Sequence, residues 1–357
     1  MSEDIKPIPT ATDLFGAKTK QLARFCVDPS WSAYNPSICY TEEHGYLVLL
    51  RSSNGWLKDH REEWQTPVGE ELTTADSYLN PGEWYAAAYI TPQQGSEKLF
   101  RNRMFIAKLN PKALTLSNIR EIDLTEAYNS FPIFLTRGIE DGRLYHDGTD
   151  LRISATIFES REVSYARICN VKLDMSGEHP KGVSLEMYDS PRGEEIVEKN
   201  WMPIHKPSLY SDVDFDYLYD SGYTYSIKDQ DITHVGGPEL PVRGGSQLVG
   251  LDNGTMLAIV HQTVTAEFIR FANITKPPLM RRRYAHRFIQ YDEKGRIIKV
   301  TDPFNFIDKS IEFASGICID QNRVLVTFGA LDSSAHIASF PLKNVLSALR
   351  PPLIKST

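Results

Sequence analysis

Residues 144–157 read LYHDGTDLRISATI, in which alternating apolar residues stand on both sides of a turn of Asp and Gly. This pattern is typical of a β-hairpin, because Gly, Asn and Asp tolerate the positive φ angles of tight turns. The same pattern recurs at 38–50, 209–227, 248–261 and 317–328. Five copies of one hairpin predict an all-β protein folded as a five-bladed β-propeller. A propeller brings one turn of every blade to a central pocket, so residues far apart in sequence can build one site.

Strands that contain alanine follow most of these hairpins and extend each predicted blade to three or four strands; they lie at 104–109, 165–173, 284–291 and 335–342. The chain has 357 residues, of which 41% are hydrophobic, enough for a large core. Prolines are spread through the turns instead of gathering in one hinge. We therefore predict an N-terminal arm or helix at 1–33, one propeller domain at 34–342, and a tail with a short helix at 343–357.

The net charge of −7 and the pI of about 5.8 give no general attraction to nucleic acid or to an anionic membrane. The sequence has neither a secretory leader nor a run of about eighteen apolar residues, so we expect a cytoplasmic protein without a membrane span. Its four cysteines form no CxxC pair, which is typical of reduced, mostly buried thiols. Metal-ligand spacings, a P-loop and a GxSxG motif are absent from the sequence, so we predict neither a metal nor a cofactor.

The most informative polar cluster reads RGIEDGR and directly precedes the hairpin at 144–157. Asp141 is a candidate general acid, and Arg137 or Arg143 is a candidate to hold either Asp141 or an anionic group of a substrate. Glu140 is a further candidate ligand. The alternative is a surface turn whose ion pairs contribute little.

Two later segments also combine cations with groups that suit a ligand. Lys199 and Trp201 precede the third hairpin, where they predict an anion site beside an aromatic wall for a sugar ring, or else a Trp-Pro corner in the core. Arg243 opens the sequence RGGS, whose glycines suit the approach of backbone N–H groups to an anion. A glycine bulge at the entrance of the blade is the alternative.

The strand at 281–287 reads RRRYAHR, and alternation places Tyr284 and His286 on one of its faces. Both are candidate ligands, and one basic patch on an acidic protein gives only weak support to nucleic-acid binding. His261 is a candidate donor or else a core histidine. Asp332 suits a carboxylate that binds sugar hydroxyls, or one that caps the following turn.

Taken in order, these segments resemble glycoside hydrolase family 130, five-bladed propellers that include inverting β-mannoside phosphorylases, and the related β-1,2-mannosyltransferases. The resemblance runs through NPSI at 35–38, GIEDGR at 138–143, KNW at 199–201, RGGS at 243–246 with His261 and Tyr284, FASG at 313–316 and FGALD at 328–332.

The resemblance implies that Asp141 is the proton donor and Lys199 an anion ligand, and it makes Arg161 a candidate phosphate-binding arginine. Three positions depart from the family pattern: Gly142 replaces the proline of EDPR, RGGS replaces the usual small residues, and VHQ at 260–262 replaces YHG.

Our hypothesis from the sequence is an enzyme that makes or breaks a glycosidic bond with inversion. Its partners would be an oligosaccharide and inorganic phosphate, a sugar phosphate or a nucleotide-sugar. Asp141 would transfer the proton, and Lys199, Arg243, His286 and Arg161 would bind the phosphate. Because phosphate is already a nucleophile, a phosphorylase needs one carboxylic acid, whereas an inverting hydrolase needs two carboxyl groups about 6.5–9.5 Å apart.

Two other classes of function stay open. A hydrolase would take Glu312 or Asp332 as its second carboxylate. A non-catalytic carbohydrate-binding propeller would use Trp201, Tyr223 and Tyr284 as stacking platforms and Asp141 as a hydroxyl ligand.

Overall fold

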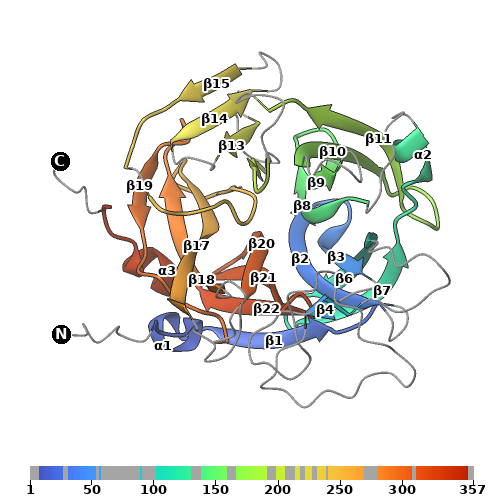
Figure 1. Cartoon of the computed structure of the whole chain (residues 1–357). Helices are drawn as coiled ribbons and strands as arrows, with labels where there is room; N and C mark the ends of the chain where they lie inside the picture. Colours follow the sequence, from blue (N-terminus) through green and yellow to red (C-terminus); the bar gives the residue numbers. More distant parts are fainter. Residues whose placement is uncertain are drawn as a thin grey trace, which may run out of the picture.

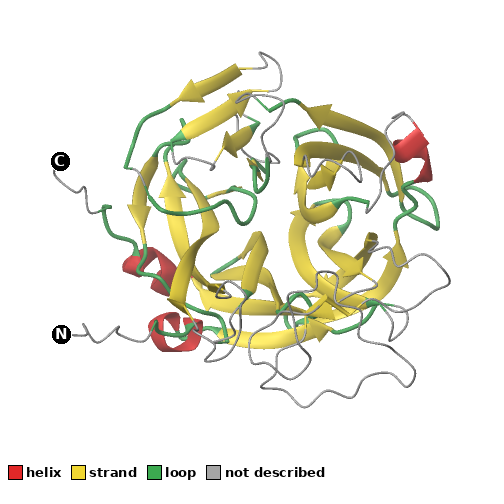
Figure 2. Ribbon diagram, viewed as in Figure 1, coloured by secondary structure: helices red, strands yellow, loops and turns green. Residues whose placement is uncertain are grey.

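The computed structural model describes residues 8–26, 31–53, 56–57, 89–90, 102–129, 138–158, 166–190, 198–205, 214–217, 222–226, 231–238, 240–268, 280–307 and 311–352. Strands make up most of this part of the chain, and the short helices lie toward its periphery (Figure 2). The sheets are arranged around a central axis like the blades of a propeller (Figure 1). The predicted all-β, propeller-like architecture is therefore confirmed.

The described strands form five four-stranded antiparallel sheets and one two-stranded sheet of β4 (Trp56–Leu57) and β5 (Tyr89–Ile90). Within four of the larger sheets the strands lie side by side in the order of the chain, whereas in the fifth β1 (Lys18–Ala23) lies beside β22 (Ser334–Pro341). The sheets consist of β2 (Ser32–Thr41), β3 (Gly45–Ser53), β6 (Asn102–Asn110) and β7 (Thr115–Glu121); β8 (Glu140–His146), β9 (Leu151–Phe158), β10 (Ala166–Asp174) and β11 (Lys181–Tyr188); β12 (Met202–Pro203), β13 (Phe215–Tyr217), β14 (Tyr223–Ser226) and β15 (Asp231–His234); β16 (Val249–Gly250), β17 (Met256–Phe268), β18 (Met280–Tyr291) and β19 (Ile297–Val300); and β20 (Glu312–Asp320), β21 (Arg323–Ala330), β22 (Ser334–Pro341) and β1 (Lys18–Ala23). The remaining elements are α1 (Ala11–Phe15), α2 (Thr125–Asn129) and α3 (Leu342–Ala348).

Each predicted hairpin contains a pair of adjacent strands, namely β2–β3, β8–β9, β13–β14, β16–β17 and β20–β21. The turn glycines that the pattern requires are present, because Gly45 and Gly254 have φ values of 71° and 79°. The innermost strands β2, β8 and β20 lie near the axis, whereas β7, β11, β15, β19 and β1 lie at the rim (Figure 1).

The N-terminal strand β1 departs from the arm or helix that the sequence predicts for residues 1–33. It pairs with β22, so the last sheet combines strands from both ends of the chain (Figure 1). The sequence KTKQLA of β1 is mostly polar and shows no apolar alternation. As the outermost strand of its sheet it needs only backbone pairing along one edge, which explains why its composition gives no strand signal.

Helices α1 and α3 cover this closing sheet. Thr10 and Asp13 form a capping box at the start of α1, and Gly16 ends the helix with a φ of 68°. Helix α3 lies where the sequence predicts a short helix, although it begins at Leu342, one residue before the predicted tail. Within the described residues, no helix combines the length and the apolar character needed to cross a membrane.

Phe15 at the end of α1 connects this helix to a cluster of aromatic side chains in the core. Its ring centroid lies 5.0 Å from that of Phe304 and 5.6 Å from those of Phe288 and Phe340, in edge-to-face geometry. Its side chain is fully buried. The start of the chain is therefore held by core packing as well as by the pairing of β1.

We expect Phe15→Ala to lower the free energy of unfolding by about 3–5 kcal/mol, because it leaves a cavity in this cluster. Denaturant unfolding followed by circular dichroism measures the effect. Phe25→Ala is the matched control: its ring is exposed, so the expected change is below about 1 kcal/mol. Equal effects of the two substitutions would contradict the packing of α1 in the core.

The innermost strands are joined directly to one another across the axis. The Gln247 side-chain amide donates to the carbonyl oxygens of Ile38 at 2.6 Å and Ile317 at 2.9 Å. The Ser37 hydroxyl accepts a hydrogen bond from the Leu144 backbone N–H at 2.9 Å. These bonds fix the relative height of the strands, so the residues at each end of the axis have defined neighbours.

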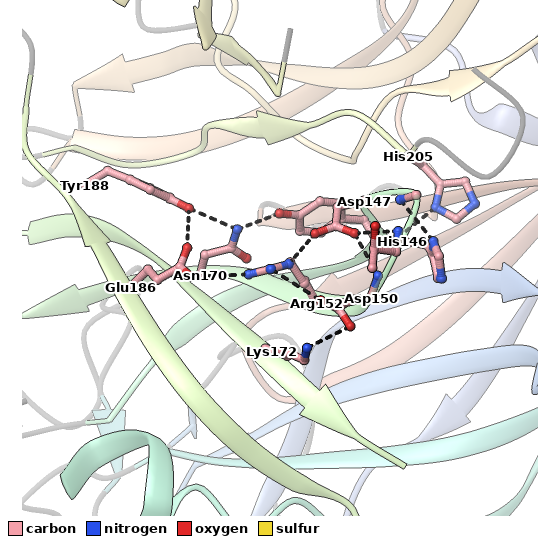
Figure 3. Close-up of polar contacts among 12 residues, drawn as sticks. His146, Asp147, Asp150, Arg152, Asn170, Lys172, Glu186, Tyr188 and His205 are labelled. Carbon is pink, nitrogen blue, oxygen red and sulfur yellow. Dashed lines mark hydrogen bonds and ion pairs between the residues drawn. The ribbon is translucent and has the colours of Figure 1, made fainter. Parts of the chain in front are cut away.

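One end of the axis lies at the C-terminal end of β8. The Nδ1 atom of His205 accepts a hydrogen bond from the His146 backbone N–H at 3.1 Å, and Cys39 Sγ lies 3.7 Å from the same nitrogen. Beside it, Asp147 caps the β8–β9 turn and pairs with Arg152 (Figure 3). Burial lowers the pKa of His205 to about 4, with a smaller contribution from His146. The contacts of His205 with His146 and Cys39 therefore need a neutral imidazole.

The stability of the protein should therefore fall in mild acid. The usual pKa of histidine is 6.5 and that of folded His205 is about 4, so the unfolded chain takes up the proton first and unfolding becomes easier as the pH falls from about 6.5 toward 4. We expect wild type to lose about 2 kcal/mol more between pH 7 and pH 5 than His205→Gln, which keeps an acceptor but does not titrate. Urea unfolding at both pH values tests this, and parallel losses in the two proteins would contradict it.

Candidate functional site

Four polar residues at the other end of the axis have left-handed backbone. Asn35, Asp141, Asn200 and Asp332 have φ values of 43°, 51°, 65° and 47°. Such conformations cost roughly 1–3 kcal/mol each and cluster at functional sites, where the surroundings enforce them. These residues lie in or next to β2, β8, β12 and β21, which belong to four different sheets.

A β-bulge aims the side chain of Asp141. The pairing of β8 with β9 shifts between Glu140 and Arg143, which leaves one extra residue on β8. A Cβ atom on Gly142 would lie 2.7 Å from methyl groups of both Ile153 and Leu49, so a larger residue there would require these side chains to move. Bulges often redirect a side chain beside a functional site.

Asp141 contacts two side chains of the first sheet. Its Oδ1 atom accepts hydrogen bonds from Asn35 Nδ2 at 2.8 Å and from the Arg51 guanidinium at 2.7 Å. Arg51 also lies 3.3 Å from Glu140 Oε1 and donates to Asn102 Oδ1 at 2.8 Å. Since the Arg51 side chain is buried, water screens these ion pairs much less than those of a surface turn.

The environment keeps Asp141 ionised. Burial raises the pKa of its carboxyl group, but the Arg51 charge, the hydrogen bond from Asn35 and the charges of Arg143 and Lys199 together lower it to about 2. Sequence reasoning missed Arg51. The available signal was an arginine directly after the apolar run LVLL of β3, at a position where a buried charge requires partners.

Asp332 lies close to the same arginine. Burial raises the pKa of the Tyr34 hydroxyl, the charge of Arg51 lowers it, and the negative charge of Asp332 raises it further. The strand before Asp332 approaches Asn35 closely, because a Cβ atom on Gly329 would lie 2.0 Å from Asn35 Oδ1. The first and last sheets thus meet beside Asp141.

Of the two roles predicted for Arg143, the structure favours holding Asp141 over binding an anionic group of a substrate. Only 1% of the Arg143 surface is exposed. Its guanidinium donates to the backbone carbonyl of Asp141 at 2.7 Å, to Asn200 Oδ1 at 2.9 Å and to the carbonyl of Gly245 at 2.8 Å. Because Asp141, Asn200 and Gly245 occupy these N–H groups, the contacts of Arg143 are internal.

The cations Lys199 and Arg243 lie in this neighbourhood. The charge of half-buried Lys199 contributes to the lowered pKa of Asp141. Arg243 is exposed, and its backbone pairs with His261 through bonds of 2.7 Å and 3.0 Å. The glycine after it permits close packing rather than an open cradle, since a Cβ on Gly244 would lie 1.9 Å from the Asn200 carbonyl oxygen.

The two predicted histidines lie side by side on β17 and β18 but are neutral. His261 is directly opposite His286, with ring centroids 6.5 Å apart. Burial lowers the pKa of His261 to about 3, assisted by the charges of Arg143 and Arg243. Burial also lowers the pKa of fully buried His286, which is therefore no cation for phosphate. Tyr284 is half-buried, with its ring centroid 4.9 Å from that of His261.

Trp201 is a core residue and not the predicted sugar-stacking wall. Its side chain is 1% exposed, and its indole N–H donates to Glu198 at 3.1 Å. The rings of Tyr188, Phe215 and Tyr225 surround it. The core alternative for this motif is thus the correct one.

The remaining predicted residues are Arg137, Arg161 and Glu312. Arg137 and Arg161 lie outside the described residues. Glu312 is fully buried and accepts the backbone N–H groups of Phe306 at 2.6 Å and Ile307 at 3.0 Å, so its carboxylate serves a structural turn. Among the residues described, no cluster of three or more acidic, His or Cys side chains could hold a metal ion.

Comparison with known proteins gives structural likenesses only. No family model and no curated protein matches the sequence. Similar solved structures include a β-1,2-mannobiose phosphorylase from Listeria innocua, with 14% identity, a TM-score of 0.49 and coverage of 90% of this chain and 94% of that one. A mannose phosphorylase from Leishmania mexicana, in complex with phosphate ion, shows 10% identity, a TM-score of 0.48 and coverage of 95% and 93%. At these values the likenesses carry no argument about activity.

We expect Arg51→Gln to raise the pKa of Asp141 from about 2 to its usual value of 3.8 or above, because the nearest positive charge is lost while burial persists. Carboxyl ¹³C NMR, with Asp141→Asn as the assignment variant, measures this pKa. Arg103→Gln on the same sheet, which removes an arginine that pairs with Glu121, should leave it unchanged. A pKa near 2 in Arg51→Gln would show that another group keeps Asp141 ionised.

Proposed function

We propose that the five sheets are the blades of one five-bladed propeller, which adds strand β1 at residues 18–23 to the predicted domain of residues 34–342. We further propose that its Asp141 end is the active site of a carbohydrate-active enzyme. The enzyme makes or breaks a glycosidic bond with inversion and uses phosphate or a phosphorylated sugar donor. The observation that carries the proposal is the convergence of the ionised carboxylate of Asp141, which lies on bulged, left-handed backbone, with the cations Lys199 and Arg243.

Ionised Asp141 suits proton transfer to and from a sugar oxygen. When a glycosidic bond forms, its carboxylate accepts the proton of the acceptor hydroxyl, and when the bond is cleaved the same group returns a proton to the leaving oxygen. A sugar that separates Asp141 from Arg51 would remove the main interaction that favours the ionised form. Its pKa would then rise toward the range in which a carboxylic acid can donate.

Lys199 and Arg243 supply the positive charge for an anion. A phosphate oxygen bound there would attack the anomeric carbon as the bond to the glycosidic oxygen breaks, so no second carboxylate is needed to activate water. Arginine binds phosphate with two parallel hydrogen bonds, which suits exposed Arg243. The phosphate of a sugar phosphate or nucleotide-sugar would fit the same cations, in a protein that we place in the cytoplasm.

An inverting hydrolase is the second candidate, because Asp332 lies near Arg51 and Tyr34 and could activate water. A purely carbohydrate-binding propeller is less well supported, since Trp201, one of its three stacking platforms, is buried in the core.

Asp141→Asn should lower turnover by about 10²–10⁴-fold, because Asn cannot exchange the proton. Release and uptake of phosphate with a panel of mannosides, glucosides and nucleotide-sugars measures turnover. Asp150→Asn, in the turn at the opposite end of β8, is the control and should keep the wild-type rate. Wild-type turnover in Asp141→Asn would remove this residue from the mechanism.

Lys199→Ala should raise the KM for phosphate by about tenfold or more, through loss of a charge-assisted contact. The KM for the sugar should change less. A hydrolase would show no phosphate dependence in either protein, so this experiment separates the two candidate reactions.

A further inference from the structure

The Arg143 guanidinium joins four sheets at the Asp141 end of the axis. Its three hydrogen bonds reach the backbone of Asp141 on β8, the side chain of Asn200 before β12 and the backbone of Gly245 before β16. The same group lies 5.4 Å from the ring centroid of Phe313 on β20. A planar fork with five N–H donors can make these bonds simultaneously, whereas the point charge of lysine cannot.

Two of these partners, Asp141 and Asn200, have left-handed backbone. Asp141 carries the proposed catalytic carboxylate, and Asn200 is the neighbour of Lys199 in the sequence. Asp141 itself has a φ of 51°, and Asn200, next to Lys199, has a φ of 65°. Arg143 binds the main-chain carbonyl of Asp141, while Arg51 and Asn35 bind its carboxylate. Arg143 therefore holds the main chain from which the carboxylate projects and does not bind the carboxylate itself.

We propose that Arg143 is a positioning residue that couples Asp141 to the segments carrying Lys199 and Arg243. It keeps the distance between the carboxylate of Asp141 and these two cations constant. This inference deepens the proposed function and rests on it for the identity of the ligands. A shift of Asn200 when an anion binds at Lys199 would be transmitted through one rigid guanidinium to the bulge that carries Asp141.

The test compares Arg143→Lys with Arg152→Lys. Arg152 lies on the neighbouring strand β9 at the opposite end of the sheet, where it contacts Asp147, Asp150 and Glu186 (Figure 3). Both substitutions keep the positive charge and remove a well-partnered guanidinium from the same sheet. A purely structural role predicts similar losses of thermal stability and no difference at Asp141.

The first measurement is the titration of the Asp141 carboxyl group by ¹³C NMR, which needs no ligand. In Arg143→Lys we expect Asp141 to become an about tenfold weaker acid, because its carboxylate moves relative to Arg51 and Lys199. Arg152→Lys should leave it unchanged. An unchanged titration in folded Arg143→Lys would overturn the proposal.

The second measurement is calorimetric binding of inorganic phosphate in a double-mutant cycle. Asp141→Asn should tighten binding about fivefold in the wild-type background, because it removes a nearby negative charge, and less than about twofold in the Arg143→Lys background. Equal effects in the two backgrounds would overturn the coupling. If the wild-type protein binds no phosphate, the proposed phosphate-dependent function is contradicted. The titration of the Asp141 carboxyl group still tests the role of Arg143 in that case.

Discussion

The position of every group at the Asp141 end depends on how the innermost strands are held against one another. Gln247 provides this constraint, since its amide donates to Ile38 and Ile317 and its carbonyl oxygen accepts the Ile317 N–H at 3.3 Å. Ser315 adds a hydrogen bond to the Pro36 carbonyl at 3.0 Å. All of these groups are buried, so loss of one partner would leave an unsatisfied polar group in the core at a cost of about 1–3 kcal/mol. The axis therefore acts as a rigid frame.

On this frame the polar groups sit where regular pairing is interrupted. The registers of β2, β8 and β20 shift between Tyr34 and Ser37, between Glu140 and Arg143, and between Ala314 and Gly316. Each shift frees one or two residues from the sheet while the rest of the strand stays fixed. The ring can thus hold Asn35 and Asp141 in non-regular backbone, with the Asn35 amide donating to the Asp141 carboxylate, without weakening the hydrogen bonds that hold the strands.

Local signals in the sequence were sufficient for the hairpins, because alternation and turn residues act over a few positions. They were insufficient for β1, whose polar residues become a strand only when β22 is available. The candidate site likewise combines a residue that the local sequence predicts with properties that depend on distant residues. Asp141 was predicted from its motif, but its ionised state depends on Arg51, 90 residues away. Likewise, the core role of Trp201 follows from aromatic partners contributed by separate strands.

The pairing of β1 with β22 has a consequence for synthesis of the protein. The ribosome makes residues 18–23 more than 300 residues before it makes residues 334–341. At about 5–20 residues per second, β1 waits on the order of tens of seconds for its partner. An apolar segment would be prone to associate with other nascent chains during that delay. The lysines and glutamine of KTKQLA keep the waiting segment hydrated, so the composition that conceals this strand also protects the unfinished polypeptide.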